Sequence, residues 1–415
     1  MNAAPEGVNE PRAPTHAAAM PVYLDHAATT PVDPRVAARM AEILASPSEF
    51  GNPASSSHAY GDTAGALIET ARAQVAAAVG AAVDEIVWTS GATEANNLAI
   101  FGVAEYYRDR GRHIITARTE HKAVLDPCRE LERRGWQVTY LVPDRGGLLA
   151  PDQVAAALRP DTVLVSIMHV NNEIGVVQDI AAIGAICTRH GGAWLHVDAA
   201  QSMGKCALSM GGFGIDLLSL SAHKIYGPKG SGALVVSKRR GVGGGAHGGA
   251  RVHLTPRQFG GAQERGLRAG TLATHQVAGM GLAFELARGL QEEEIARLRP
   301  LQERLWQGLS AIGGVLRNGN ALRCVPHLLN VSFEGVEGES LLAAVRPHLA
   351  LSTGSACTSS LAEPSYVLRA LGRSERLSES SLRFGLGRTT REREIDTAIA
   401  VLSQQVARLR RIAGA

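Results

Sequence analysis

Residues 194–224 read WLHVDAAQSMGKCALSMGGFGIDLLSLSAHK, and this stretch decides the fold. It holds two short apolar runs, Trp194–Val197 and Leu217–Leu220, each of the length expected of a buried strand. Asp198 follows the first run, and Lys224 follows the second. Because an open α/β sheet exposes the carboxyl ends of its parallel strands at one edge, we expect the acid and the lysine to share a cavity there.

Short apolar runs alternate with helix-like stretches on both sides of this segment, from Glu85 onward. Such alternation is typical of parallel strands joined by right-handed crossovers, so we expect a mostly parallel, seven-stranded sheet in an α/β/α sandwich. The expected strands are Ile86–Thr89, His113–Ala117, Gln137–Val142, Thr162–Met168, Trp194–Val197, Leu217–Leu220 and Ala233–Val236. The expected helices are Glu94–Tyr107, Lys122–Arg134, Gln153–Leu158 and Ile180–His190.

The pattern changes after Thr271, where a helical stretch to about Gly308 leads into a smaller α+β domain. Its expected strands are Leu328–Phe333, Leu341–Val345, Leu349–Ser352 and Ser381–Gly385. Glu392–Arg411 carries apolar residues at steps of three and four, which predicts an amphipathic closing helix. The expected organisation is a disordered tail at 1–20, an N-terminal arm at 21–34 that joins the small domain, a large domain at 35–285 and a small domain at 286–415. The Gly-rich segment 241–249 is expected to be a flexible surface loop.

Composition excludes several classes of protein. The 415 residues are 45% hydrophobic and 20% charged, which is typical of a soluble globular chain rather than a disordered one. The formal net charge is only +3 and the basic residues are scattered, which disfavours nucleic acid and anionic membranes as partners. No apolar run approaches the roughly 20 residues of a membrane span, and residues 1–20 do not resemble a secretory signal. The five cysteines are widely spaced without a Cys-x-x-Cys pair, so we expect neither disulfides nor a zinc site, and a cytoplasmic location.

Taken singly, each chemical candidate has a structural alternative. Lys224 can hold a carbonyl cofactor through its amine, although a solvated loop lysine is the commoner case. Asp198 at the end of a buried strand needs a cationic partner, for which a protonated pyridine nitrogen is suited, or it caps the next helix. The sequence TSGATE at 89–94 predicts a strand, a turn and a helix start, whose free N–H groups and Thr93 hydroxyl suit a phosphate. Many helices begin this way without binding anything.

Together and in this chain order, these features resemble the cysteine desulfurases, which are fold type I pyridoxal-phosphate enzymes of the class V aminotransferase family. The resemblance covers about Val22 to Leu409 and is closest to the housekeeping form that serves iron–sulfur cluster assembly. Its motifs are YLDHAATTP at 23–31, TEHKAV at 119–124, HVNNEIG at 169–175 and SACT at 355–358.

The resemblance implies roles for individual residues around pyridoxal 5'-phosphate. Lys224 would hold the cofactor and move the substrate Cα proton, Asp198 would pair with the pyridine nitrogen, and His121 would stack on the ring and assist proton transfer. The other implied cofactor contacts are Gln201 and Asn172 near the ring oxygen, and Ala92, Thr93, Ser221 and His223 near the phosphate. Asn172 and Arg383 would contact the substrate, and Thr271 would reach the phosphate of a neighbouring subunit, which implies a homodimer. Without the motifs, a packing histidine and a surface ion pair would be the commoner explanations of His121 and Arg383.

Cys357 decides which reaction the family scaffold runs, because sulfur abstraction needs a nucleophile whereas transamination needs no thiol. It lies among small polar residues at 352–360, which suits a mobile loop. The expected reaction converts L-cysteine to L-alanine and leaves a persulfide on Cys357. The resemblance implies that acceptor proteins in iron–sulfur cluster assembly and tRNA thiolation take this sulfur, and that Cys357 is at most a transient cluster ligand, with no intrinsic metal site. We expect the remaining cysteines to be packing residues at Cys128, Cys187 and Cys324, and an exposed turn residue without a role at Cys206.

Two rival functions remain open at this point. One is another enzyme of the same fold, such as a selenocysteine lyase or another class V aminotransferase. The other is a catalytically silent scaffold protein, against which the joint presence of Lys224, Asp198, His121, Arg383 and Cys357 argues.

Two features depart from the family pattern. The stretch from Lys238 to Glu264 is longer than usual, which predicts a different dimer edge. The sequence ends soon after Arg410 and Arg411, where close relatives continue into a tail that helps to dock the scaffold protein, so we expect scaffold docking to differ.

Overall fold

The computed structural model describes residues 20–238, 251–353 and 364–414. Within these residues a seven-stranded sheet has the strand order β2-β8-β7-β6-β5-β3-β4. Strand β8 is antiparallel to both of its neighbours, and the other pairs are parallel. The mostly parallel sheet predicted from the sequence is therefore confirmed. Its strands are β2 (Ile86–Thr89), β3 (His113–Ala117), β4 (Gln137–Leu141), β5 (Thr162–Ser166), β6 (Trp194–Asp198), β7 (Leu217–Ser221) and β8 (Gly232–Val236).

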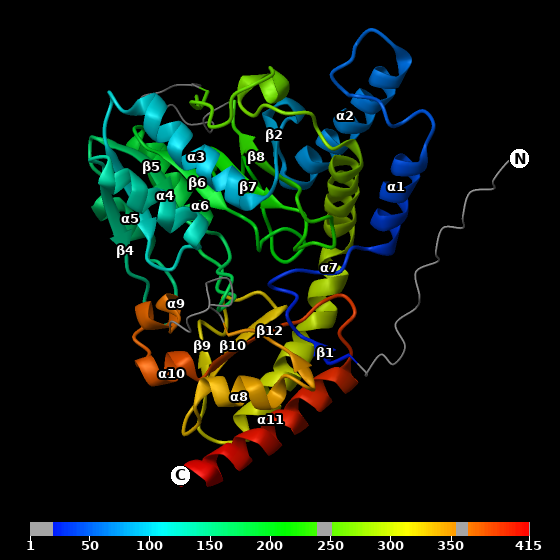
Figure 1. Ribbon diagram of the computed structural model, residues 1–415. Helices are drawn as coiled ribbons and strands as arrows, with labels where there is room; N and C mark the ends of the chain where they lie inside the picture. Colours follow the sequence, from blue (N-terminus) through cyan, green and yellow to red (C-terminus); the bar gives the residue numbers. More distant parts are fainter. Residues whose placement is uncertain (1–19, 239–250, 354–363, 415) are drawn as a thin grey trace, which may run out of the picture.

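Helices cover both faces of this sheet (Figure 1). Successive strand residues point to opposite faces, so Val87 joins one apolar core while Ile86 and Trp88 join the other. The core of Val87 is closed by α3 (Ala92–Tyr107) and α4 (Lys122–Arg133). The core of Trp88 is closed by α1 (Pro34–Ala45), α2 (Ala59–Val79), α5 (Pro151–Ala157), α6 (Ile180–His190) and the first half of α7 (Thr274–Ser310). Two short 3-10 helices, Val83–Glu85 and Gln263–Gly266, lie beside β2 and before α7.

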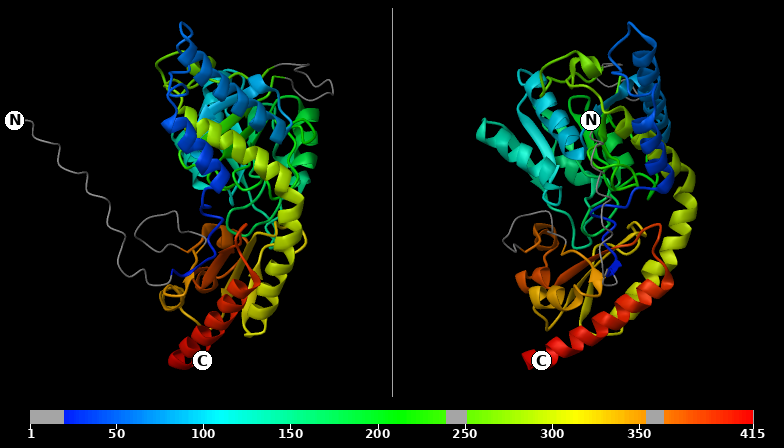
Figure 2. Two further views of the ribbon diagram at one scale, coloured as in Figure 1. Left: turned by 90° about the vertical axis from the view of Figure 1, so that its right-hand side faces the viewer. Right: turned by 45° about the vertical axis from the view of Figure 1, so that its right-hand side comes forward.

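A second, antiparallel sheet has its own core. In the described residues its strand order is β12-β10-β9, with β9 at Val315–Asn318, β10 at Leu328–Phe333 and β12 at Ser381–Gly385. This core is closed by α8 (Gly338–Val345), α11 (Glu392–Ala413) and the second half of α7, while α9 (Tyr366–Ala370) and α10 (Glu375–Glu379) are shorter. Helix α7 has 37 residues and runs past both sheets, as Figure 2 shows in olive and yellow.

The N-terminal arm lies against the small sheet. Strand β1 (Val22–Tyr23) pairs in parallel with β11 (Leu349–Ala350), and Asp25 forms a bridge to Gly385 at the end of β12. The arm therefore passes between the two sheets before it enters α1, and this path brings its residues close to the edge of the large sheet.

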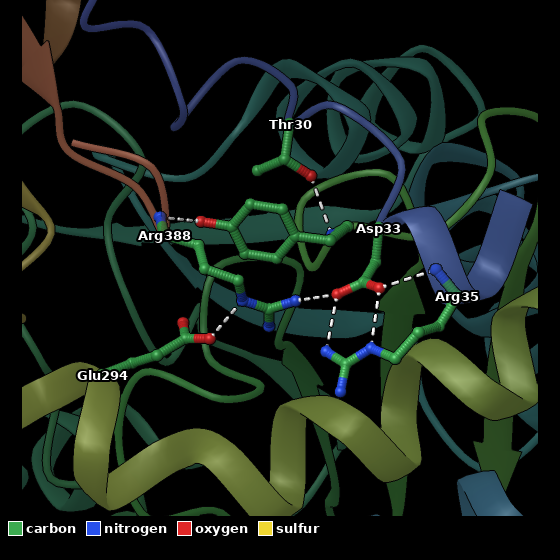
Figure 3. Close-up of polar contacts among 6 residues, drawn as sticks. Thr30, Asp33, Arg35, Glu294 and Arg388 are labelled. Carbon is green, nitrogen blue, oxygen red and sulfur yellow. Dashed lines mark hydrogen bonds and ion pairs between the residues drawn. The ribbon is translucent and has the colours of Figure 1, made fainter.

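A network of ionic contacts ties the arm to α7 and to the loop after β12 (Figure 3). The Asp33 carboxylate accepts hydrogen bonds from the backbone N–H and the guanidinium of Arg35, at 3.0 and 2.8–2.9 Å, and so caps α1. The same carboxylate pairs with Arg388, which also pairs with Glu294 on α7. The strand that leads to Arg388 is β12, so the network fixes where β12 meets the arm.

One predicted strand is wrong. Leu341–Val345 forms the second half of helix α8, because its apolar residues Leu341 and Val345 are four apart and both face the small core. The Glu337 carboxylate accepts hydrogen bonds from the backbone N–H groups of Glu339 and Ser340 at 3.2 and 2.7 Å, which starts the helix. The predicted tail at 1–20, apart from Met20, and the predicted Gly-rich loop lie outside the described residues. None of the helices in the described ranges is long and apolar enough to cross a membrane.

Candidate active site

A cavity of about 420 Å³ lies at the carboxyl edge of the large sheet. Asp198 and Lys224 line it together, because β6 and β7 are parallel neighbours that end at the same edge. Loops that follow β2, β3 and β5 supply much of the remaining wall. The sequence-predicted residues that line this cavity are Ala92, Thr93, His121, Asn172, Asp198, Gln201, Ser221, His223, Lys224 and Arg383.

Asp198 is a buried carboxylate held by two hydrogen bonds. It is 6% exposed, and its Oδ2 accepts from Asn96 Nδ2 at 2.7 Å while its Oδ1 accepts from the backbone N–H of Ala200 at 3.0 Å. The next residues form a turn rather than a helix, so Asp198 is not a helix cap. Each carboxylate oxygen keeps a second lone pair, and the group lines the cavity, which leaves it able to accept from a cationic N–H.

Sequence reasoning did not predict Asn96. This residue is fully buried on α3, three positions after Thr93, and donates to Asp198 across 102 residues of sequence. The signal that was available is that Ala99, Ile100 and Val103, which follow three, four and seven positions later, place Asn96 on an apolar helix face, where a buried amide needs a polar partner.

The turn between β2 and α3 forms a polar rim of the cavity. Ser90, Gly91 and Thr93 line it, and α3 begins at Ala92, so the first N–H groups of the helix have no partner within the helix. A Cβ on Gly232 would lie 2.5 Å from the Cα of Gly91, so only glycine allows β8 to approach the turn this closely. A helix start of this kind attracts an anionic group such as a phosphate.

Ser221 and His223 form another part of the wall. His223 Nδ1 lies 3.1 Å from Thr29 Oγ1, and its backbone carbonyl accepts from the hydroxyl of Thr30 at 3.0 Å. Burial, with nearby Lys224, lowers the pKa of His223 to about 4. The ring is therefore neutral at pH 7, and its hydrogen bond to Thr29 ties the N-terminal arm to the cavity.

His121 is a helix cap and a cavity residue at once. It precedes α4, and its Nδ1 accepts from the backbone N–H of Ala123 at 3.1 Å. Burial lowers the pKa of His121 below its ordinary value, against the opposing effect of Asp198. The neutral ring therefore carries its proton on Nε2, since Nδ1 is used as an acceptor.

Arg383 reaches the cavity from the small sheet. It is 3% exposed, and its guanidinium pairs with Asp25 Oδ1 at 2.9 Å and donates to the backbone carbonyl of Asn172 at 3.0 Å. Ser352 Oγ donates to the same Asp25 oxygen at 3.0 Å. Arg383 is buried and Asp25 is partly buried, so the surface ion pair considered from the sequence is wrong, and Asp25 is a partner that the sequence did not predict.

Two buried polar atoms near this pair have no hydrogen-bond partner among the described residues. They are Asn172 Oδ1 and Arg383 Nε. Buried polar atoms are nearly always satisfied, so their orphaned state indicates that a polar ligand completes the site.

Two predicted site residues are not part of this cavity as described. Thr271 is exposed and does not line it. Cys357 lies outside the described residues. The residues on either side of that gap are held beside the site, because Ser352 contacts Asp25 and Ser365 donates to the buried carboxylate of Glu173.

The other cysteines are free thiols in the described part of the chain. Cys128, Cys187 and Cys324 are buried, which agrees with their prediction as packing residues. The prediction for Cys206 is wrong, because this residue is partly buried, with Sγ 3.7 Å from the carbonyl of Ser202. Burial raises the pKa of its thiol to about 12, so it is protonated at neutral pH.

These residues fit pyridoxal phosphate. Lys224 supplies an amine, Asp198 a carboxylate for a protonated ring nitrogen, and the start of α3 a site for a phosphate. The orphaned Asn172 Oδ1 offers a further polar contact. A mostly parallel sheet with this set of residues at its carboxyl edge defines a pyridoxal-phosphate enzyme of fold type I.

Comparison with known proteins narrows the class. The aminotransferase class-V family matches residues 22–397. A cysteine desulfurase IscS from Methylococcus capsulatus is 56% identical over 95% of this chain and 94% of its own length, and one from Salmonella schwarzengrund is 54% identical over 94% of each. Among solved structures, a NifS-like protein has a TM-score of 0.85 at 32% identity, covering 94% of this chain and all of its own. DndA from Streptomyces lividans has a TM-score of 0.72 at 41% identity, covering 89% of this chain and 99% of its own. The chain therefore belongs to the aminotransferase class-V family and, within it, to the pyridoxal-phosphate-dependent cysteine desulfurases.

Proposed function

We propose that this chain takes the sulfur atom from L-cysteine, releases L-alanine and holds the sulfur as a persulfide on Cys357. The observation that carries the proposal is the placement of Lys224, Asp198 and Arg383 around one cavity. An amine, a buried acid and a buried guanidinium are together what an amino-acid substrate and this cofactor require. A relative of known structure, SspA, which is 37% identical with a TM-score of 0.75 over 88% of this chain and 98% of its own, was solved in complex with cysteine.

In this proposal some of the residues bind the cofactor and others bind the substrate. Pyridoxal phosphate, when bound, withdraws electrons from the Cα of an attached amino acid and so makes loss of its proton easier. In this proposal Lys224 anchors the cofactor and carries that proton, while Asp198 keeps the ring nitrogen protonated. Arg383 binds the substrate carboxylate, and Asn172 orients the substrate beside it. His121 contacts the ring and offers its Nε2–H.

The sulfur step requires a thiolate near the substrate Sγ. Cys357 is five residues beyond Ser352, which contacts Asp25 beside Arg383. An extended chain of five residues spans up to about 16–18 Å, so the backbone allows the thiol to reach the cavity. An S–S bond to Cys357 forms as the Cβ–S bond of the substrate breaks, and the electron pair of the broken bond stays on carbon and takes up a proton to give alanine.

The wider assignments are also proposals. We infer a homodimer in which Thr271 reaches the phosphate site of the partner subunit, a cytoplasmic location, and iron–sulfur scaffold proteins and tRNA thiolation proteins as sulfur acceptors. The relatives named IscS support the acceptor class. The separate apolar cores of the two sheets support the division into a large domain at 35–285 and a small domain at 286–415.

The test is to incubate the purified protein with L-cysteine and to weigh the peptide that contains Cys357. We expect one added sulfur atom on that peptide and L-alanine in solution. Cys357→Ala should remain yellow but form neither product, whereas Cys206→Ala should behave like the parent, because that thiol is protonated. Unchanged turnover in Cys357→Ala would remove this residue from the mechanism.

The same experiment separates the rival activities. A keto acid without a persulfide would indicate a class V aminotransferase. Turnover of L-selenocysteine with none of L-cysteine would indicate a selenocysteine lyase. A colourless protein that binds no pyridoxal phosphate would indicate the silent scaffold.

A further inference from the structure

Lys205 is a partly buried lysine that the proposed reaction does not use. Its Nζ donates a hydrogen bond to Gln201 Oε1 at 3.1 Å. Gln201 is 3% exposed and lines the cofactor cavity, whereas Lys205 lines a separate small chamber. Gln201 therefore stands between the cofactor cavity and the lysine.

Two contacts fix the orientation of the Gln201 amide. Its Nε2 donates to the backbone carbonyl of Ala27 at 2.7 Å, and its Oε1 accepts from Lys205. If the amide were flipped, its N–H group would face the N–H donor of Lys205, and its oxygen would face the carbonyl oxygen of Ala27. Both contacts would then be repulsive. One N–H of Nε2 is used by Ala27, and the other is left for the cavity. Gln201 therefore presents a donor to a bound ligand.

The chamber behind Gln201 can satisfy the other N–H groups of Lys205. It has a volume of about 20 Å³, room for about one water molecule, and His26 and His327 also line it. His26 Nδ1 and both ring nitrogens of His327 are buried without a hydrogen-bond partner among the described residues. Burial lowers the pKa of His26 to about 4 and that of His327 well below its ordinary value, so both rings are neutral and each offers an acceptor nitrogen.

The acid that lines the chamber is ion-paired with another cation among the described residues, although its charge also acts on Lys205. Glu294 is engaged by Arg388 through an ion pair. Lys205 therefore has Gln201 as its direct partner and a polar chamber, able to hold water, for its remaining donors. Burial lowers the pKa of Lys205 to about 7, so keeping an amine at this position carries a desolvation cost that the contact with Gln201 helps to offset.

We propose that Lys205 is a positioning residue that holds Gln201 so that its free N–H points at the ring oxygen of bound pyridoxal phosphate. The inference rests on the proposed function, because it assigns Gln201 to that oxygen. Lys205 itself touches neither the cofactor nor the substrate. Without it, the amide loses one of the two contacts that set its direction and turns its oxygen toward the cavity for part of the time.

The test is a double-mutant cycle on cofactor binding. Protein freed of cofactor is titrated with pyridoxal phosphate, and the Kd and the position of the visible absorption band are measured for the parent, Lys205→Met, Gln201→Ala and the double variant. We expect Lys205→Met to weaken binding about three- to tenfold, the range of one hydrogen bond, and to move the band. Because Lys205 acts through Gln201, the double variant should bind like Gln201→Ala alone.

Two further variants make the cycle specific. Lys238→Met removes a partly exposed lysine that is paired with Asp84, and its affinity and band position should match those of the parent. This variant controls for the loss of a lysine charge. Lys205→Arg keeps a donor at this position and should recover most of the affinity and the band position. If Lys205→Met does not fold, the cycle is run with Lys205→Leu, which is shorter and also carries no hydrogen-bond donor.

The outcomes are distinct. Additive effects of the two substitutions, or a Lys205 variant with the affinity and band of the parent, would overturn the role of Lys205. A parent protein that binds no pyridoxal phosphate would instead overturn the proposed function. If the parent binds pyridoxal phosphate and the two substitutions have additive effects, the proposed function stands and only the role of Lys205 is refuted.

Discussion

The two sheets hold their functional side chains in different ways. The large sheet supplies Asp198 and Lys224 from its carboxyl edge, and the groups that hold Asp198 belong to the same sheet and to α3. The small sheet supplies Arg383 from within β12, and its partners lie elsewhere, on the N-terminal arm at Asp25 and on a loop of the large sheet at Asn172. The contacts that hold Asp198, in the cofactor half of the site, thus come from one unit, whereas the contacts that hold Arg383, in the substrate half, exist only where two units meet.

This difference has a functional consequence. Substitutions that act on Asp198 or Lys224 should impair cofactor binding. Substitutions around Arg383 should impair substrate binding while the cofactor stays in place. Variants that impair only cofactor binding or only substrate binding support this division. A variant that impairs both equally contradicts it.

The largest effect is expected for Lys224→Ala. It removes both the covalent anchor of the cofactor and the group that moves the substrate proton, and general acid–base catalysis alone contributes about 10²–10⁴-fold. We expect a colourless protein after dialysis and alanine formation reduced by about 10³-fold or more. Absorption spectra and a product assay measure the two losses. A yellow, active Lys224→Ala protein would contradict the assignment of the cofactor half.

Arg383→Lys should impair the substrate half alone. Lysine keeps the charge but not the planar, two-pronged donor geometry that suits a carboxylate, and its single nitrogen cannot take the places of the two guanidinium nitrogens that contact Asn172 and Asp25. We expect kcat/KM for L-cysteine to fall about ten- to a hundredfold, mainly through KM, with an unchanged Kd for pyridoxal phosphate. Loss of cofactor affinity in this variant would show that the two halves are not separate.

The same division explains what the sequence revealed. The strands of the large sheet were predictable because both of their faces are buried, so they appear as continuous apolar runs. Helices α1 and α2 were not predicted; α2 is rich in alanine, and its apolar and polar faces differ little. The strand predicted at Leu341–Val345 failed because a short apolar run fits a buried helix equally well.

The site was predictable only in part. The motif residues came from the family resemblance, since each of them taken alone had a structural alternative. Asn96 and Asp25 were missed because their roles depend on contacts 102 and 358 residues away, which no local pattern encodes. Lys205 was missed for the same kind of reason, because its contact with Gln201 can be interpreted only after the cavity has been located.

Asn96→Ala should weaken the cofactor half more mildly. It removes one hydrogen bond to Asp198 and leaves a buried carboxylate oxygen without that donor, which costs about 1–2 kcal/mol. We expect the Kd for pyridoxal phosphate to rise about tenfold, with the KM for L-cysteine little changed. The control is Asn97→Ala, because Asn97 is partly exposed and its side chain bonds to the backbone of its own helix at Thr93. Equal effects of the two variants would mean that the helix, rather than the contact with Asp198, is responsible.

The smallest effect concerns the ionic network between the arm and α7, which sets where the two halves meet. Hydrogen bonds from Arg35, together with nearby Arg388, lower the pKa of Asp33 to about 2 in the folded protein. An unfolded aspartate titrates near 3.9, so the ionised group stabilises the fold above about pH 4 and loses this effect as the pH falls toward 2. Asp33→Asn should therefore lower the free energy of unfolding by about 1–2 kcal/mol at pH 7 and by about half as much at pH 3.

Urea unfolding of the parent and of Asp33→Asn at the two pH values measures this difference. Asp109→Asn is the matched control, because its carboxylate is exposed and it should match the parent throughout. A loss of stability in Asp33→Asn that is the same at both pH values would mean that the cap of α1, and not the charge of the network, accounts for the effect. In that case the junction of the two sheets would be held by apolar packing along α7, and the substrate half would be less sensitive to the arm than the contacts of Arg383 imply.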